Sequence, residues 1–320
     1  NFREGFLNMK EMVDVIAVVV THNRKRLLLR CLRAIFSQTS KVTKVIVVDN
    51  ASSDGTKDFI FSASEFSDEE KQRMLWTALE KNLGGAGGFS VGVERAIAQK
   101  PDFLWLMDDD GFPSENCLSK LLKLSSPFSF ISPVVLSDKD KSSLSFPLRI
   151  RGSLKILENL ADVRSLESNV IEGVVAPFNG TLISSDLIAK IGYPDKNFFI
   201  WGDEVDYTER ARAAGAKIFT VSNSLYFHPK GQNVGNPMFF GLIRFNEPNS
   251  RIKLYCYCRN NVYNLRRYNG ITKAALFSIK VLWYYTLTKF NREGLSIAIC
   301  GLIDGITGNF KNHQKFLSSV

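Results

Sequence analysis

The sequence is poor in histidine and cysteine, the residues that build zinc sites and disulfide frameworks. The 320-residue chain contains three histidines and five cysteines, and the cysteines are scattered and odd in number. No CxxC or Cys/His spacing typical of a zinc site occurs. We therefore expect reduced thiols and a cytosolic setting, and not a disulfide-bonded secreted domain.

Long apolar runs are also missing. None reaches the roughly 18–20 residues that a membrane-spanning helix requires. The longest candidates, 274–287 and 295–306, are interrupted by Lys280 and Asp304. Charged residues in the first fourteen positions argue against a secretory signal peptide. We interpret residues 1–12 as an N-terminal extension or as residues added by cloning.

Acidic residues are absent between positions 251 and 292, in a chain whose net charge is +9. The same stretch carries many basic residues: Arg251, Lys253, Arg259, Arg266, Arg267, Lys273, Lys280, Lys289 and Arg292. Tyrosine, tryptophan and phenylalanine are interleaved with them, which fits an anionic membrane surface. The alternative is a helical subdomain that packs on the core. No nucleic-acid motif occurs, so we expect no nucleic-acid partner.

A short apolar run that ends in three aspartates, residues 103–111, is the most informative stretch. Phe103–Met107 is typical of a buried strand in a parallel sheet, whose carboxyl end borders the ligand site. Side chains alternate along a strand, so Asp108 and Asp110 are expected to point one way and Asp109 the other. Two carboxylates on one side suit Mg²⁺ or Mn²⁺. The alternative is a solvated acidic turn.

Apolar strands and amphipathic helices alternate along the first 230 residues. We expect strands at 13–20, 42–48, 75–79, 103–107, 130–136 and 217–221, and helices at 25–37, 58–73, 90–99, 115–124 and 204–214. This alternation predicts right-handed βαβ units, a mostly parallel central sheet and helices on both faces. Residues 137–169 are polar and weakly patterned, so we expect a mobile or partner-facing insertion. The chain after residue 250 is expected to be helical.

Three further features are candidates for chemistry. The glycine-rich segment 82–89 precedes a helix, where backbone amides favour an anion, although a plain turn is the alternative. The acidic group 203–206 opens a predicted helix. Helix capping explains one or two of its carboxylates, and three after an aromatic run indicate catalysis. His228 follows a strand at the same predicted edge, as a metal ligand or a structural residue.

Together these residues resemble the inverting glycosyltransferases of family 2, which have the GT-A fold. The resemblance covers about residues 13–230 and is carried by Thr21–Arg24, Val47–Asn50, Asp108–Asp110 and Asp203–Asp206. Within the family, the segments 82–89 and 105–111 are similar to galactofuranosyltransferases. The fold expected is therefore α/β of the GT-A type, with a Rossmann-like sheet and a C-terminal helical extension.

The resemblance implies a nucleotide-sugar site and a metal site. Asp49 would bind the nucleotide base, and the implied donor-binding residues are Thr21, Arg24, Asp49, Asn82, Gly84, Gly85, Asp108 and Asp109. The implied ligands of Mn²⁺ or Mg²⁺ are Asp108, Asp110 and His228, with Asp110 the more direct one.

The resemblance also implies a general base and an acceptor site. Glu204 matches the position of the base, which is usually Asp in the family, so Asp203 stays open as the base instead. Asp206 would hold an acceptor hydroxyl, and Trp201 and Asn179 are the other acceptor-binding candidates.

The resulting expectation is transfer of galactofuranose from UDP-galactofuranose. The acceptor would be a glycan or a polyprenyl-diphosphate-linked precursor of a surface polysaccharide such as O-antigen, at the inner face of the cytoplasmic membrane. A rhamnosyltransferase that uses dTDP-rhamnose is the nearest alternative. A nucleotidyltransferase and a non-catalytic glycan-binding protein are more distant ones. Residues 13–250 would form the catalytic domain and 251–320 a basic, aromatic, helical region.

Overall fold

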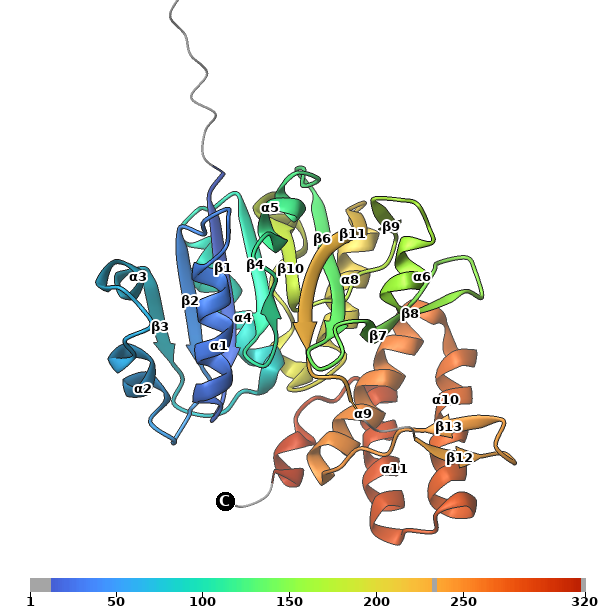
Figure 1. Cartoon of the computed structure of the whole chain (residues 1–320). Helices are drawn as coiled ribbons and strands as arrows, with labels where there is room; N and C mark the ends of the chain where they lie inside the picture. The colour runs from blue at the N-terminus through green and yellow to red at the C-terminus, as the bar shows by residue number, and fades with distance from the viewer. Residues whose placement is uncertain (1–12, 232–234, 318–320) are drawn as a thin grey trace, which may run out of the picture.

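The structure, a computed structural model, describes residues 13–231 and 235–317 (Figure 1). The N-terminal extension expected at residues 1–12 lies outside the described residues.

A twisted sheet forms the centre of the molecule, in the order β3-β2-β1-β4-β10-β6-β11-β5. Its strands are β1 (Val15–Thr21), β2 (Lys44–Asp49), β3 (Met74–Ala78), β4 (Phe103–Asp108), β5 (Phe112–Pro113), β6 (Ser129–Ser137), β10 (Asn179–Ser184) and β11 (Lys217–His228). β3, β2, β1 and β4 are parallel, β10 is antiparallel to β4 and β6, and β11 is parallel to β6. The predicted mostly parallel sheet is confirmed.

Helices cover both faces of this sheet, which explains why β1 is buried along its whole length. One face packs against α1 (Lys25–Phe36), α2 (Thr56–Ser62) and α5 (Cys117–Leu122). The other packs against α4 (Gly84–Ile97), α7 (Ser185–Ile191) and α8 (Asp203–Ala213). Successive β4 residues alternate between the two cores, so Trp105 belongs to the first and Leu106 to the second.

Two local predictions were wrong. The helix expected at 90–99 begins at Gly84, so most of the glycine-rich segment is helical. Its glycines permit close packing on the sheet, since a Cβ at Gly88 would lie 2.5 Å from Val20 and one at Gly92 would lie 2.4 Å from Val18. The helix expected at 58–73 is two short ones, α2 and α3 (Asp68–Gln72).

The segment 137–169 was expected to be a mobile or partner-facing insertion, and it is instead folded. It contains β7 (Ser143–Arg149), β8 (Ile156–Asn159) and α6 (Leu160–Arg164), and β9 (Val170–Glu172) follows. Leu144, Leu157 and Val163 pack with β6 in an apolar cluster of their own. Each element contributes so few apolar residues that no periodic pattern stands out in the sequence.

The C-terminal part is helical, as predicted, and packs below the sheet in the view of Figure 1. It comprises α9 (Arg251–Asn264), α10 (Ile271–Trp283), α11 (Arg292–Thr307), the π-helical turns η2 (Leu265–Asn269) and η3 (Tyr284–Thr288), and the 3₁₀ turn η4 (Asn312–Phe316). The hairpin of β12 (Asn236–Met238) and β13 (Ile243–Phe245) shares their apolar core. The domain boundary at residue 250 stays a proposal.

Within the described residues, none of the helices combines the length and the apolar character that crossing a membrane requires.

Candidate functional site

The carboxyl ends of three adjacent parallel strands bring the first predicted residues together. Thr21 at the end of β1 pairs in register with Asp49 at the end of β2, and Val20 pairs with Asp108 of β4. The Thr21 hydroxyl donates a 2.7 Å hydrogen bond to Asp109 Oδ2. The sheet therefore gathers the residues of three strand ends at one edge, where ligands of open α/β sheets bind.

The repulsion among the three aspartates is reduced in two ways: Arg24 pairs with Asp109 and Asp110, and burial raises the pKa of Asp108 and Asp109. Arg24 Nη1 donates to Asp109 Oδ1 at 3.2 Å and to Asp110 Oδ2 at 3.0 Å. Burial, with the charges of Asp110 and Asp109, raises the pKa of Asp108 to about 8. Burial also raises the pKa of Asp109 to about 6, against the hydrogen bond from Thr21 and the charge of Arg24. Burial therefore favours the neutral forms of Asp108 and Asp109, whereas Thr21 and Arg24 favour the charged form of Asp109.

Asp110 and His228 form the part of the site that suits a divalent cation. His228 Nε2 lies 3.2 Å from Asp110 Oδ1, yet this buried oxygen has no aligned hydrogen bond. His228 Nδ1 lies 2.8 Å from the carbonyl oxygen of Pro229, which can only accept, so Nδ1 carries a proton and Nε2 faces Asp110. Burial acts to raise the pKa of Asp110, but His228 outweighs it and holds that pKa below its ordinary value.

The predicted set of three metal ligands is not assembled. Among residues 13–231 and 235–317, no group of three or more His, Cys, Asp or Glu side chains is placed to hold a metal ion. Asp108 therefore does not complete a cluster with Asp110 and His228. Two protein ligands nevertheless fit a cation that takes its other ligands from substrate phosphates and water, as Mg²⁺ commonly does.

The glycine-rich segment is anchored to the carboxyl ends of the strands by Asn50, which carried part of the resemblance but was not among the predicted site residues. Asn50 Nδ2 donates to Gly84 O at 2.9 Å, and its Oδ1 accepts from Leu83 N at 2.8 Å. The predicted Asn82 closes the same turn, since its Oδ1 accepts from Gly84 N at 2.8 Å. Its position could have identified it from the sequence, because Asn50 directly follows Asp49 at the end of a predicted strand.

Residues 198–202 lie between the glycine-rich segment at the start of α4 and the second acidic group, residues 203–206. Phe199, Trp201 and Gly202 have φ values of 66°, 60° and 87°, a strained run just before α8. The amide of Ala86 in α4 donates to Phe199 O at 3.2 Å. The glycine-rich segment and the segment that bears the predicted base are therefore in direct contact.

Asp203 and Glu204 form a coupled carboxyl pair at the start of α8. Burial and the adjacent Glu204 raise the pKa of Asp203 well above its ordinary value, and the charge of Asp108 adds to this. Burial also raises the pKa of Glu204, against hydrogen bonds from backbone amides and from Asp203. Both shifts favour the neutral carboxylic acid forms, and the two adjacent groups titrate as a pair.

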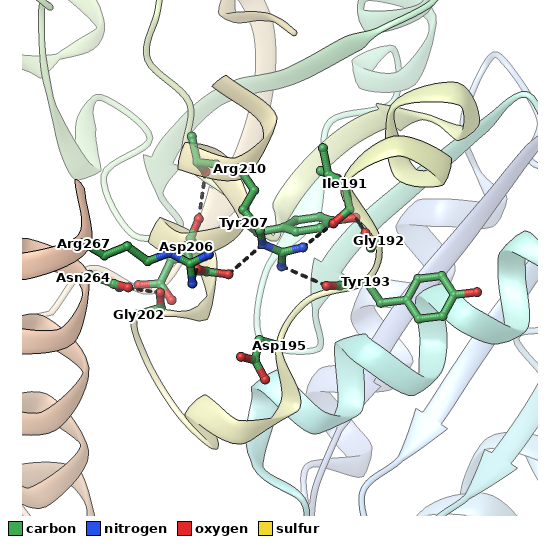
Figure 2. Close-up of polar contacts among 12 residues, drawn as sticks. Ile191, Gly192, Tyr193, Asp195, Gly202, Asp206, Tyr207, Arg210, Asn264 and Arg267 are labelled. Carbon is green, nitrogen blue, oxygen red and sulfur yellow. Dashed lines mark hydrogen bonds and ion pairs between the residues drawn. The ribbon is translucent and has the colours of Figure 1, made fainter. Parts of the chain in front are cut away.

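Asp206 is engaged within the protein, as Figure 2 shows for its position between Arg210 and Arg267. Its Oδ2 accepts from Arg210 Nε at 2.8 Å, and its Oδ1 accepts from the hydroxyl of Tyr268 at 2.5 Å and lies 3.4 Å from Arg267 Nη1. These contacts hold α8 against η2. Binding of an acceptor hydroxyl by Asp206 stays a prediction that requires one of these partners to move.

The other two acceptor candidates lie at different places. Trp201 is 40% exposed, and Lys253 Nζ lies 5.7 Å from its ring centroid. Asn179 is buried on β10 opposite Met107, so it adjoins the aspartate cluster. Asn179 Nδ2 donates to Pro177 O at 2.9 Å, and its Oδ1 is buried without a partner.

Side chains of α9 hold the segment 197–202 through its carbonyl oxygens, a role that sequence reasoning missed. Arg259 is fully buried and donates from Nη2 to Phe198 O at 2.6 Å. Asn260 Nδ2 lies within 2.6–3.1 Å of the carbonyl oxygens of residues 198, 200 and 201, and Asn264 Nδ2 donates to Gly202 O at 2.8 Å. The C-terminal helices therefore set the backbone that precedes Glu204.

Comparison with known proteins agrees with this geometry. Residues 16–159 match the family described as Glycosyl transferase family 2. The chain is 33% identical over 288 residues to the galactofuranosyltransferase GlfT1 of Mycolicibacterium smegmatis, a match that covers 88% of this chain and 92% of that protein. It is also 33% identical over 287 residues to GlfT1 of Mycobacterium tuberculosis H37Rv, with the same coverage.

Solved structures share the fold at low sequence identity. Residues 1–349 of S. aureus TarS align with a TM-score of 0.55 and 14% identity, over 93% of this chain and 82% of that one. GalNAc-T7 with UDP, GalNAc and Mn²⁺ aligns with a TM-score of 0.59 and 12% identity, over 97% of this chain and 59% of that one. The predicted GT-A architecture is confirmed.

Fold and site together define a glycosyltransferase. The chain belongs to glycosyltransferase family 2, and it is close to the galactofuranosyltransferases within that family. The predicted family and enzyme class are confirmed.

Proposed function

We propose that this glycosyltransferase moves galactofuranose from UDP-galactofuranose, with inversion, onto a glycan or a polyprenyl-diphosphate-linked acceptor. The observation that carries the proposal is the contact of Ala86 in α4 with the carbonyl oxygen of Phe199, which brings the glycine-rich segment at the strand ends against the segment that leads into Glu204. The choice of donor rests on the 33% identity to galactofuranosyltransferases. A rhamnosyl donor is the alternative that the test below separates.

The donor would lie along the strand ends. Asp49 would bind the uracil, and Arg24, which is half exposed, would turn from the aspartates toward the diphosphate. The backbone near Gly84 and Gly85 would approach the donor closely. TarS with UDP-GlcNAc, which aligns with a TM-score of 0.52 and 13% identity over 96% of this chain and 91% of that one, supports a nucleotide-sugar donor for this fold.

In the proposed reaction Glu204 is the general base. The bond between the acceptor oxygen and C1 of the sugar forms as the bond between C1 and the diphosphate oxygen breaks. The acceptor proton passes to Glu204, and the electron pair of the broken bond leaves with UDP. Attack from the face opposite UDP inverts the anomeric carbon. Asp203 keeps Glu204 oriented by its hydrogen bond.

Asp110 and His228 would hold Mn²⁺ or Mg²⁺, because a buried carboxylate oxygen that accepts no aligned hydrogen bond lies 3.2 Å from a ring nitrogen there. The cation would offset the negative charge that the leaving UDP gains. The Mn²⁺ of GalNAc-T7 supports a divalent cation at a site of this fold.

The proposal is tested with a panel of nucleotide sugars, with and without EDTA, by measuring the release of UDP or dTDP. We expect release from UDP-galactofuranose above all, lost with EDTA and restored by Mn²⁺ or Mg²⁺. The variant Asp110→Ala is expected to lose the response to Mn²⁺ titration. Preference for dTDP-rhamnose would show that the donor is rhamnosyl and not galactofuranosyl. Release of pyrophosphate would indicate a nucleotidyltransferase, and binding without turnover would indicate a glycan-binding protein.

A polyprenyl-diphosphate-linked acceptor would require contact with a membrane, and the C-terminal part has a suitable surface. Phe240 and Leu242 at the tip of the β12–β13 hairpin are almost wholly exposed. Leu276 and Ile279 of α10 are also exposed, among the basic residues of that helix. The ring of Phe239 lies against that of Trp283 in a tilted arrangement, with 4.5 Å between the ring centroids, and this contact joins the hairpin to α10. We infer that this surface rests on anionic lipid, on the inner face of the cytoplasmic membrane.

Replacing both Phe240 and Leu242 with serine is expected to weaken binding to liposomes that contain anionic phospholipid at least tenfold. Burial of one such side chain contributes about 1.5–3 kcal/mol. The measurement is co-sedimentation. Leu154→Ser removes an equally exposed apolar residue on the turn between β7 and β8, and binding of this control is expected to match the original protein. Equal binding of all three proteins would refute the membrane contact of the hairpin.

A further inference from the structure

A cavity of about 640 Å³ lies beside the predicted base, between the start of α8 and one face of α9. Trp201, Glu204 and Val205 line one wall. Lys253, Tyr257, Asn261 and Asn264 line the other, at the spacing that places residues on one helix face. The volume falls within the roughly 300–1,000 Å³ of pockets that enclose small ligands.

Asn264 has a buried acceptor that nothing in the chain satisfies. Its side chain is almost fully buried, with 5% exposed, and Nδ2 donates to Gly202 O at 2.8 Å. Oδ1 is buried without a hydrogen-bond partner, and Asn264 is one of the residues that line the cavity. A buried acceptor left unpaired costs about 1–3 kcal/mol, so a ligand that donates a hydrogen bond here recovers that loss.

The chemistry of the lining favours a sugar. Amide side chains both donate and accept, and thus match the hydroxyls of a polyol; the lining contains Asn246, Asn249, Asn261, Asn264 and Asn269. The ring of Trp201 gives a flat apolar surface on which a sugar ring packs. Lys253 is the single cation among the lining residues of the described chain, which is too few for a diphosphate.

We propose that the terminal sugar of the acceptor binds in this cavity, with one hydroxyl donating to Asn264 Oδ1. This inference rests on the proposed function. The Nδ2 bond to Gly202, which directly precedes α8, ties the same side chain to the helix that carries Glu204. One residue of the C-terminal part then orients the acceptor and fixes the start of the base-bearing helix, so that a second hydroxyl of the sugar meets Glu204.

The test compares Asn264→Ala with the original protein, using a glycan acceptor and a set of its monodeoxy analogues. We expect the KM for the acceptor to rise at least tenfold and the Kd for UDP, measured by calorimetry, to stay unchanged. One deoxy analogue is expected to lose at least tenfold in kcat/KM with the original protein and nothing further with Asn264→Ala. Additive losses for every analogue would overturn the contact.

Two more variants keep the result interpretable. Asn309→Ala removes a structural hydrogen bond to Asp304 elsewhere in the C-terminal part, and its acceptor KM is expected to be unchanged. Val205→Trp fills the cavity from a position that is 44% exposed, so it tests the cavity even if Asn264→Ala fails to fold. An unchanged acceptor KM in Val205→Trp would overturn the inference, whereas an original protein that uses no nucleotide sugar would overturn the proposed function itself.

Discussion

Replacing Glu204 with glutamine is expected to lower the rate of sugar transfer about 10²–10⁴-fold and to leave the affinity for UDP unchanged. The amide keeps the size of the side chain but cannot take the proton of the acceptor hydroxyl. Initial rates of glycan formation measure the first effect, and calorimetric titration with UDP measures the second. Normal turnover of Glu204→Gln would remove Glu204 as the base.

Asp203→Asn is the matched variant. If Glu204 is the base, Asp203 is its protonated partner, and an amide at position 203 can replace the hydrogen bond between them. We therefore expect a loss of about tenfold or less, the cost of one weakened hydrogen bond. A larger loss in Asp203→Asn than in Glu204→Gln would make Asp203 the base and leave Glu204 as its partner.

The same pair sets the direction of the pH dependence. Burial raises the pKa of Glu204 above its ordinary 4.5, and a general base works only when it is deprotonated. Transfer is therefore expected to be lost as the pH falls through this raised pKa, so the acidic limb of the rate profile lies above pH 4.5. The limb is expected to disappear from the residual rate of Glu204→Gln.

Replacing Gly84 with alanine is expected to lower the free energy of unfolding by about 2–5 kcal/mol. Gly84 has a φ of 72°, where a side chain costs about 1–2 kcal/mol, and its Cβ would lie 1.9 Å from Phe199 O. Relief of such an overlap costs about 1–3 kcal/mol more, because the obstacle is backbone. The measurements are the midpoint of urea unfolding and the rate of transfer, which falls as residues 198–202 move.

Gly85→Ala is the control one residue further on. A Cβ there meets nothing within 4 Å, and the position is helical, so the fold is expected to gain up to about 1 kcal/mol. If the donor approaches this backbone as proposed, the added methyl group raises the KM for the donor without loss of stability. Equal destabilisation by both substitutions would contradict the close contact with Phe199.

The parts predicted best from the sequence are those with a strong local signal. β1 and β4 are apolar along nearly their whole length because both faces of the sheet are covered, so their pattern could be read directly. The resemblance implied that Thr21, Asp49 and Asp108 belong to one site, and the register of the three parallel strands brings their ends together. The strands between 143 and 159 were missed because their partners, and not their own pattern, make them strands.

The parts that could not be predicted depend on contacts between distant residues. The raised pKa values of Asp203 and Glu204 depend first on burial, which comes from the packing around the start of α8 and not from the local sequence. Neither Arg259 nor Asn260 carries a local sign that it binds carbonyl oxygens about 60 positions earlier. The assignment of Glu204 as base therefore came from resemblance, and the reason for its orientation came only from the structure.

The buried bonds from α9 to residues 197–202 bear on how new acceptor preferences can be engineered. A chimera that receives the C-terminal helices of a relative would place foreign side chains against carbonyl oxygens shaped for Arg259 and Asn260. Activity would then be lost because the backbone of residues 197–202 moves, even if the transplanted pocket binds the new acceptor. Exchanging residues 197–202 together with the C-terminal helices keeps the hydrogen bonds between them. This is the smallest exchange in which a change in acceptor specificity can be interpreted.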